Sequence, residues 1–293
     1  MEAIDLNQHL VSQFSHYQAI LFPFAYNITG DAMAAEDIVQ EVLNNQLLAS
    51  SGEVKNPKHY LIRSVINRSI NEKKLLRNKR EYRGKWLPVP VLTEENIYAG
   101  ADREKILHYS LLVVLEKLSA KERAVFILKE TFDFEHDEIA GLLKIKVDHS
   151  RQLLKRAKEK ILPHATKTGK ITLQNQQLLQ QLKEAISSSD IEKTKYLLSN
   201  DIECTSDGGS KVRAARNILV GKDPVSKFLR AIYGKYFPEG ATSQFATVNH
   251  HPAIVFSLDK KIFRCMVLEI EDEVIRKVFI IVNPDKLQHL HFT

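Results

Sequence analysis

Apolar residues recur at three- and four-residue spacing through the first 83 residues, a period that predicts amphipathic helices. Residues 84–103 lose this period and contain two prolines. Because proline restricts its own backbone and that of the preceding residue, this stretch predicts an extended linker. Helical spacing returns over residues 104–163. The chain therefore begins with two predicted helical blocks joined by an extended segment.

After a polar joint at residues 164–170, the pattern changes to a mixture of helix and strand. Residues 173–188 and 191–198 have the spacing of amphipathic helices. Alternating or continuous apolar runs then predict strands at residues 243–248, 253–258, 262–270 and 274–282. These elements predict an α+β domain that is separate from the helical blocks.

Three helices are predicted within the second helical block. Ser119, with Glu122 three residues later, forms a capping box that predicts a helix from there to about residue 129. A short helix at about 135–143 directs Ile139, Leu142 and Leu143 to a core, and a third helix runs from 147 to about 161.

The third of these helices separates its apolar and basic residues. Its predicted inner stripe is Val147, Ser150, Leu154, Ala157 and Ile161, and its outer face carries Arg151, Gln152, Lys155, Arg156 and Lys158. The small residue at 150 allows the second and third helices to cross closely. This arrangement is typical of the recognition helix of a helix-turn-helix, which offers forked donors to bases and phosphates in the major groove. An ordinary solvated basic helix face is the alternative.

The composition changes this picture little. At 44% hydrophobic and 27% charged residues, it is typical of a soluble globular protein. The first residues lack the features of a secretory signal, and no apolar run approaches the roughly 18 residues of a membrane span, so we expect a cytoplasmic protein. Cys204 and Cys265 predict buried thiols, and the histidines lack zinc-ligand spacing, so no metal or cofactor is expected.

Charge is concentrated in two places. The net charge is +6, and nine basic residues fall between 63 and 85 while others gather between 151 and 160. Such clusters suit a polyanionic partner. Just before the first cluster and at its start, an aromatic is interleaved with amides and arginines, a combination that suits phosphates and unstacked bases: Tyr60, Arg63, Asn67, Arg68 and Asn71. An exposed helix rich in Asn and Arg is the alternative.

A predicted helix with an acidic face precedes this basic cluster. The segment AAEDIVQEVLNNQLL places apolar residues on one helical side and Asp37, Gln40 and Glu41 on another. An acidic, amide-bearing face beside a basic stretch favours a protein partner over nucleic acid. A solvated helix surface is the alternative.

Taken in order, these segments resemble extracytoplasmic-function (ECF) sigma factors. AAEDIVQE resembles their region 2 core-binding helix, YLIRSVINRSIN their −10 recognition and melting segment, and residues 118–161 their region 4. The resemblance implies that Asp37, Gln40 and Glu41 dock on the β′ clamp helices of core RNA polymerase and that region 4 meets the β flap. It assigns the basic cluster, with a loop at residues 56–60, to the −10 element, and the third helix to the −35 element. Asn71 stands where the family usually has Asp.

The resemblance continues to the end of the chain. YRGKWLPVP resembles the linker of the subgroup with a fused C-terminal SnoaL-like domain, DGGSK at 207–211 is similar to its DGGGK-type motif, and NPDKL at 283–287 matches its closing motif. We expect loop 207–211 to meet linker residues 86–90 and to fix the spacing of regions 2 and 4; packing of Trp86 on its own domain is the alternative. The residues expected at this regulatory contact are Trp86, Leu87, Pro88, Asp207, Gly208, Gly209 and Lys211.

The predicted fold is multidomain, with two all-α sigma domains and a C-terminal α+β SnoaL-like cone domain. The expected boundaries are 1–83 for region 2, 84–103 for the linker, 104–164 for region 4, 170–283 for the SnoaL-like domain and 284–293 for a tail. The predicted function is a sigma factor that recruits core RNA polymerase to promoter DNA. The alternative is a helix-turn-helix regulator with a small-ligand-sensing or enzymatic SnoaL-like domain.

Enzymatic activity would need side chains that act together. SnoaL-like folds include enzymes that use Asp and His, so Asp207, His250 and His251 are the candidates. We expect instead two exposed turn histidines and a tight turn at residues 207–209, because glycine supplies positive φ without strain. No catalytic residue is therefore predicted.

Overall fold

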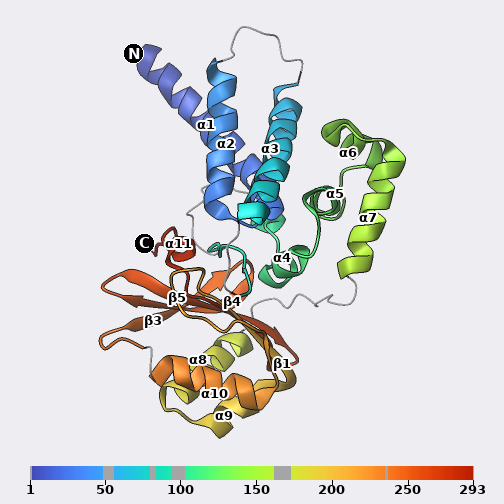
Figure 1. Cartoon of the computed structure of the whole chain (residues 1–293). Coiled ribbons are helices and arrows are strands. Elements are labelled where there is room, and N and C mark those ends of the chain that lie inside the picture. The colour runs from blue at the N-terminus through green and yellow to red at the C-terminus, as the bar shows by residue number, and fades with distance from the viewer. Residues whose placement is uncertain are drawn as a thin grey trace. The chain divides into compact units, whose positions relative to one another are not determined.

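The computed structural model describes residues 2–48, 56–79, 84–93, 103–161, 173–234 and 237–292 (Figure 1). These residues form two compact units. The first unit contains the described residues of 2–79, 103–107 and 111–161, and the second contains those of 84–93, 108–110 and 173–292.

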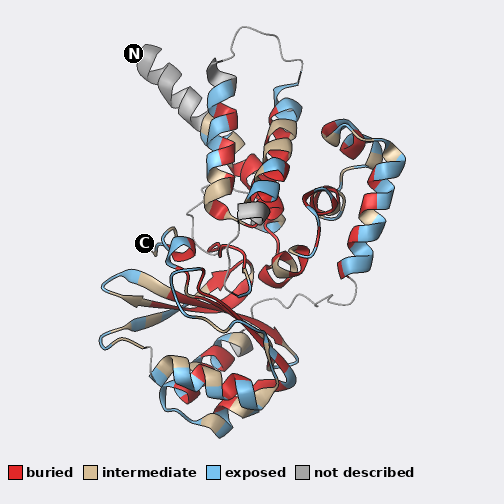
Figure 2. Ribbon diagram, in the orientation of Figure 1, coloured by how far each residue is buried: buried red, intermediate tan, exposed pale blue. Residues whose placement is uncertain are grey.

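The first unit begins with three packed helices: α1 (Glu2–Thr29), α2 (Ala32–Leu48) and α3 (Pro57–Lys79). Figure 2 marks buried residues in red on the described parts of all three helices. Phe22, Val39 and Val65 are among the buried residues, one from each helix. Between α1 and α2, Gly30 turns the chain at φ +71°. The apolar spacing of the sequence therefore forms one helical core.

The rest of the first unit is also helical. It contains the short η2 (Arg103–Lys105), α5 (Ala120–Glu130), α6 (His136–Leu143) and α7 (Val147–Ile161), and most of α4 (Tyr109–Leu115). The predicted capping box is confirmed, because the Ser119 hydroxyl accepts from the Glu122 amide and the Glu122 carboxylate accepts from the Ser119 amide. The turn after α6 places Lys144 at φ +51°, a position where glycine is common.

The second unit is a six-stranded sheet with helices on one face (Figure 1). The strand order is β2-β1-β6-β5-β4-β3; β1 runs parallel to β6 and the other neighbours are antiparallel. The strands are β1 (Leu198–Asp207), β2 (Leu219–Val220), β3 (Thr242–Val248), β4 (His251–Leu258), β5 (Lys261–Glu271) and β6 (Val274–Ile281). The helices are α8 (Leu173–Ser187), α9 (Ile191–Leu197), α10 (Lys222–Gly234) and α11 (Pro284–Leu287).

Alternation along the strands gives this sheet two buried faces. Cys204, Met266 and Ile280 belong to the core shared with α8, α9 and α10. The residues next to these in each strand point to the opposite face of the sheet. On that face, the ring of Phe279 lies 5.3 Å from the ring of Tyr109. The sheet is therefore covered by helices on one face and partly by Tyr109, the first residue of α4, on the other.

Most of the predicted elements are present, but the sequence pattern does not predict β1, β2 or α10. β1 owes its place to pairing with β6, which lies about 70 residues later in the chain, as in the pair Cys204 and Val278. The expected tail at 284–293 also differs, because it carries α11 and buries Leu287 and Leu290. No helix in the described part of the chain is long and apolar enough to cross a membrane.

Candidate nucleic-acid interface and linker clamp

The basic residues predicted for recognition lie on the outer face of α7. Arg151, Gln152, Lys155, Arg156 and Lys158 are all exposed (Figure 2). Arg151 pairs with Asp148 at 2.8 Å, and Lys158 pairs with Glu130 of α5 at 2.8 Å. Exposed pairs of this kind contribute little free energy, so phosphates can displace them.

The inner face of α7 differs from the prediction at one position. The buried residues are Ser150, Leu153, Ala157 and Ile161, whereas Leu154 is half-buried. Leu153 and Leu154 flank the stripe on opposite sides, and α7 packs against both α5 and α6, so the neighbouring helices decide which leucine is covered. The expected close crossing of α6 and α7 is present, because the Ser150 hydroxyl lies 2.9 Å from Nδ1 of His136.

Helix α3 carries the residues predicted for the −10 element, and it begins earlier than expected. Residues 57–60 form its first turn, not a loop, because the Asn56 side chain accepts from the His59 amide at 3.1 Å and caps the helix. Tyr60 is 49% exposed and Asn71 is also exposed. These side chains are therefore presented by a helix and not by a loop.

Two other predicted −10 residues already have partners within the first unit. The Asn67 side-chain amide donates to the carbonyl of Leu142, the last but one residue of α6, at 3.2 Å. Arg68 forms an ion pair with Glu41, which belongs to the face predicted to bind polymerase. Arg63 is half-buried, and Asp37, Gln40 and Glu41 are exposed. In this unit, part of α3 is thus covered by the helix-turn-helix.

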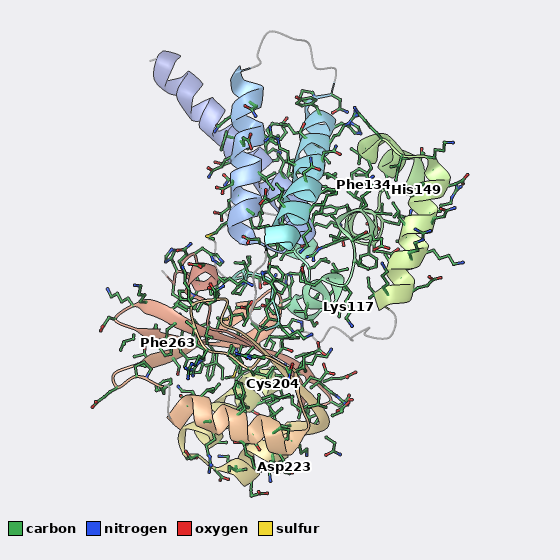
Figure 3. All side chains as sticks on the ribbon, viewed as in Figure 1. Lys117, Phe134, His149, Cys204, Asp223 and Phe263 are labelled. Atoms are coloured by element: carbon green, nitrogen blue, oxygen red, sulfur yellow. The ribbon has the colours of Figure 1, made fainter. Side chains whose placement is uncertain are left out.

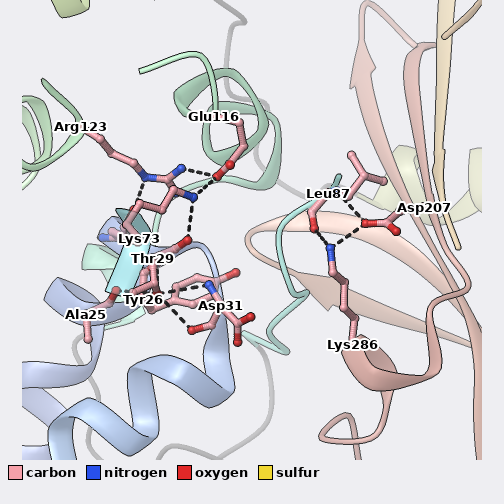
Figure 4. A network of polar contacts seen from close by, with 11 residues as sticks. Ala25, Tyr26, Thr29, Asp31, Lys73, Leu87, Glu116, Arg123, Asp207 and Lys286 are labelled. Carbon is pink, nitrogen blue, oxygen red and sulfur yellow. Dashed lines mark hydrogen bonds and ion pairs between the residues drawn. The ribbon is translucent and has the colours of Figure 1, made fainter. Parts of the chain in front are cut away.

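A buried charge network joins α3 to α5 and to the end of α1 (Figure 4). Lys73 of α3 pairs with Glu116 at 2.6 Å and donates to the Thr29 carbonyl at 2.8 Å. Arg123 of α5, with no exposed surface, also pairs with Glu116 and donates to the Asn27 carbonyl at 2.7 Å. Lys73 is one of the nine basic residues between 63 and 85 that were predicted to suit a polyanionic partner, but its burial makes it a packing residue.

In the second unit, the predicted meeting of linker and loop is present (Figure 4). Asp207, at the end of β1, accepts from the Leu87 amide at 2.8 Å and from Lys286 Nζ at 2.6 Å through the same carboxylate oxygen. Lys286 also donates to the Leu87 carbonyl. Asp207 and Lys286 are almost fully buried. We call these three residues the linker clamp.

Steric constraints explain why the DGGSK motif has glycine at positions 208 and 209. A side chain at Gly208 would place Cβ 2.1 Å from the Val212 carbonyl oxygen. Gly209 has φ +60°, and its amide donates to Asp207 at 3.0 Å. Ser210 is not among the residues with positive φ, so the turn does not require glycine there. Lys211 is exposed and pairs with Asp285 at 2.5 Å.

The remaining linker residues also have main-chain partners. Tyr109 donates to the Pro88 carbonyl at 2.7 Å, and Thr93 donates to the Thr247 carbonyl at 2.9 Å. Val91 exchanges two hydrogen bonds with Asn249. Prolines suit a buried extended segment because they have no N–H that must be satisfied. Leu87 and Pro88 are buried as part of it.

Trp86 and the closing NPDKL motif belong to the same contact. Trp86 is half-buried, and Lys286 Nζ lies 4.0 Å from its ring centre, within the range of a cation–π interaction. Asn283 caps α11 and so holds Lys286 in place. The sequence pattern does not predict Lys286 or Asn249 as linker contacts, although Lys286 belongs to the NPDKL motif.

The expectation of two exposed turn histidines is wrong for His251. Asn249 and His250 form the turn, with φ +47° and +61°, and His251 begins β4 and is buried. Its Nε2 lies 3.0 Å from the Ser110 hydroxyl. Burial, together with His108 and His250, lowers the pKa of His251 to about 3. His251 is buried where it contacts Ser110 and the ring of His108, 5.5 Å away.

The candidates for catalysis therefore have structural partners: Asp207 holds the linker and His251 contacts Ser110. His108 lies beside the rings of His250 and His251. Its pKa is lowered to about 4, mainly by burial and further by the charge of His250. In the described residues, no group of three or more His, Cys, Asp or Glu side chains is placed to hold a metal ion.

Known proteins are similar to this chain over nearly its whole length. The family model "Sigma-70, region 4" matches residues 108–161. The ECF RNA polymerase sigma factor SigJ of Mycobacterium tuberculosis is 29% identical over 248 residues, which are 82% of this chain and 78% of that protein. The probable ECF RNA polymerase sigma factor SigI of the same species is 25% identical over 284 residues, covering 94% and 93%. The crystal structure of SigJ has a TM-score of 0.74 at 24% identity and covers 95% of this chain and 98% of that one, so the two share a fold.

Proposed function

Because the chain belongs to the ECF sigma factors with a fused C-terminal SnoaL-like domain, we propose that it recruits core RNA polymerase to specific promoters and that its second unit regulates this activity. The observation that carries the proposal is the exposed basic face of α7 on a helix-turn-helix, within a chain similar to sigma factors over both units. Such a protein acts in the cytoplasm, where core polymerase and DNA are found. Its work is binding rather than catalysis.

The −35 element is assigned to α7. Arg151, Gln152 and Lys155 lie toward the N-terminal half of the helix, the part that reaches base edges in a helix-turn-helix. Arg156 and Lys158 lie further along and suit phosphates. A bidentate Arg contact specifies a base, whereas a phosphate contact positions the protein without reading sequence.

The −10 element is assigned to α3, with Tyr60, Arg63, Asn67, Arg68 and Asn71 as the contacting residues. Exposed Tyr60 is available to stack on an unpaired base, and unstacking one base costs only a few kcal/mol. The neighbouring α2 face, with Asp37, Gln40 and Glu41, is assigned to the β′ clamp helices, and region 4 to the β flap. Because Asn67 contacts α6 and Arg68 contacts Glu41, we assign the described first unit to a closed, polymerase-free state.

Regulation is assigned to the linker clamp. The linker connects the two DNA-binding parts, and within the second unit Asp207 and Lys286 hydrogen-bond to its main chain. Trp86, Leu87, Pro88, Gly208, Gly209 and Lys211 complete this regulatory contact. A linker held along a sheet spans a defined length, whereas a free linker samples many lengths, so the clamp controls how far regions 2 and 4 can separate.

Reconstituted transcription tests the proposal. Core polymerase is supplied with the full chain or with residues 1–164, and run-off products are measured on a promoter library. We expect both proteins to direct initiation from a shared −10 and −35 pattern, with different amounts of product because only the full chain has the clamp. A chain that binds duplex DNA alone but directs no polymerase-dependent initiation would be a regulator and would overturn the proposal.

A further inference from the structure

The second unit contains a cavity of about 1020 Å³ on the helix-covered face of its sheet. Phe228 and Ile232 of α10 line one side, and Phe263 of β5 (Figure 3) and Ile280 of β6 line the sheet side. Cavities of roughly 300 to 1,000 Å³ with mostly apolar walls and a few polar groups are typical of small-molecule sites. This cavity has the volume and the walls for an apolar ligand.

The charged residues of the lining indicate the sign of the ligand. Four are cationic, Lys211, Arg213, Lys261 and Arg264, and one is acidic, Asp259. Of these, Arg264 is 4% exposed. The surroundings therefore favour an anion over a neutral or cationic molecule.

Arg264 is held in place by its neighbours. Its guanidinium carbon lies 5.6 Å from the ring centres of both Phe256 and Phe263, and its Nη2 donates to the Ile232 carbonyl at 3.3 Å. Burial lowers the pKa of Arg264 to about 10, so the side chain stays charged at neutral pH. A planar guanidinium matches a carboxylate with two parallel hydrogen bonds, and such bonds are stronger in apolar surroundings.

We propose that this cavity binds an apolar monocarboxylic acid, with its carboxylate on Arg264 and its hydrocarbon part against Phe228, Ile232 and Phe263. A monoanion fits because one buried arginine among apolar walls can satisfy one carboxylate, whereas a phosphate dianion calls for more donors. The site goes beyond the proposed sigma activity, and its occupancy can be measured without polymerase.

The cavity adjoins the segment that supports the clamp. Val282 and Pro284 are part of its lining, and the Val282 amide donates to the Asp207 carbonyl at 2.8 Å. Pro284 is the first residue of α11, which carries Lys286. A bound acid therefore contacts the same stretch of chain that positions both clamp side chains.

Isothermal titration of the full chain with octanoate, octan-1-ol and acetate tests the site. Octanoate and octanol share the apolar tail, and acetate has the charge without the tail. We expect octanoate to bind roughly tenfold or more tightly than octanol, because a charged hydrogen-bonded pair is added, and acetate to bind far more weakly than either. Absence of octanoate binding, or equal affinities for octanoate and octanol, would overturn the proposal.

Variants locate the site. Arg264→Gln should weaken octanoate binding between about tenfold and a hundredfold and leave octanol unchanged. Arg230→Gln, at an exposed arginine of the same α10, is the matched control and should change neither affinity. Ile232→Trp fills the cavity and should weaken both ligands, which keeps the test decisive if Arg264→Gln folds poorly. Unchanged octanoate affinity in the folded Arg264→Gln or Ile232→Trp protein contradicts the assignment.

Discussion

His251 shows how one buried side chain makes the stability of the second unit depend on pH. Its pKa is lowered to about 3 mainly by burial, and its neighbour His108 has a pKa of about 4. The unfolded chain takes up a proton on each ring near pH 6.5. Between these values the unfolded state binds more protons than the folded state, so stability falls as the pH falls below about 6.5.

We therefore predict that the full chain loses stability between pH 6.5 and 5, above the range where most carboxylates titrate. His251→Gln should make this decline shallower, because the variant has one histidine fewer to protonate on unfolding. Urea unfolding at several pH values measures the slope, and His149→Gln, at an exposed residue of α7, is the control. Identical slopes for His251→Gln and the parent chain would refute this account of the acid sensitivity.

At the scale of helices, α7 combines a buried stripe with an exposed basic face, and the two halves of that face should act differently. Arg151→Ala is predicted to reduce discrimination between a cognate and a scrambled −35 duplex by about 1 to 3 kcal/mol. Lys158→Ala should weaken both duplexes similarly and make binding less dependent on salt. Fluorescence anisotropy at several salt concentrations measures both effects. Equal losses on the two duplexes for Arg151→Ala would show that it contacts phosphate.

The packing of α3 against α5 depends on one carboxylate, because Glu116 meets both Lys73 and Arg123. Removing one partner of a buried ion pair leaves uncompensated charge, at a typical cost of 3 to 5 kcal/mol. Glu116→Gln should therefore loosen this packing and expose the face of α3 that Asn67 now turns toward Leu142.

The measurable result is tighter binding of single-stranded −10 DNA by Glu116→Gln in the absence of polymerase, together with a lower free energy of unfolding. Glu130→Gln is the matched control, since Glu130 pairs with the exposed Lys158 on the helix-turn-helix itself. If Glu116→Gln is destabilised but binds −10 DNA with unchanged affinity, the network stabilises the unit without regulating access to α3.

At the scale of the whole molecule, the linker belongs to one unit while the helices that it connects belong to the other. Lys286→Met removes the cation that holds Asp207 and the Leu87 carbonyl, and should release the linker. Because Trp86 is the one tryptophan of the chain and Lys286 lies over its ring, its fluorescence reports the change. We expect a shifted emission maximum and a loss of about 3 to 5 kcal/mol in the second unit.

Lys211→Met is the control for this variant. Lys211 lies on the same loop as the clamp and pairs with Asp285, but both side chains are exposed, so the change should be within about 1 kcal/mol. An unchanged Trp86 spectrum in Lys286→Met would mean that the linker stays bound without the clamp.

Local signals in the sequence were sufficient for much of this protein. The helix of residues 147–161, the capping box at Ser119 and the extended linker all depend on side chains within a few positions of one another, so their period and spacing predict them directly. The order of such segments also identified the family and pointed to a meeting of Asp207 with the linker.

Burial and pairing between distant segments were decided only by the tertiary structure. β1 needs β6, Lys73 needs Glu116, and the cavity around Arg264 needs α10 to close it. The sequence shows Lys73 as one basic residue among many and His251 as part of a turn, because nothing within a few residues reveals what covers them. Hydrophobic period and capping are properties of neighbours along the chain, whereas desolvation and charge partners are properties of neighbours in space.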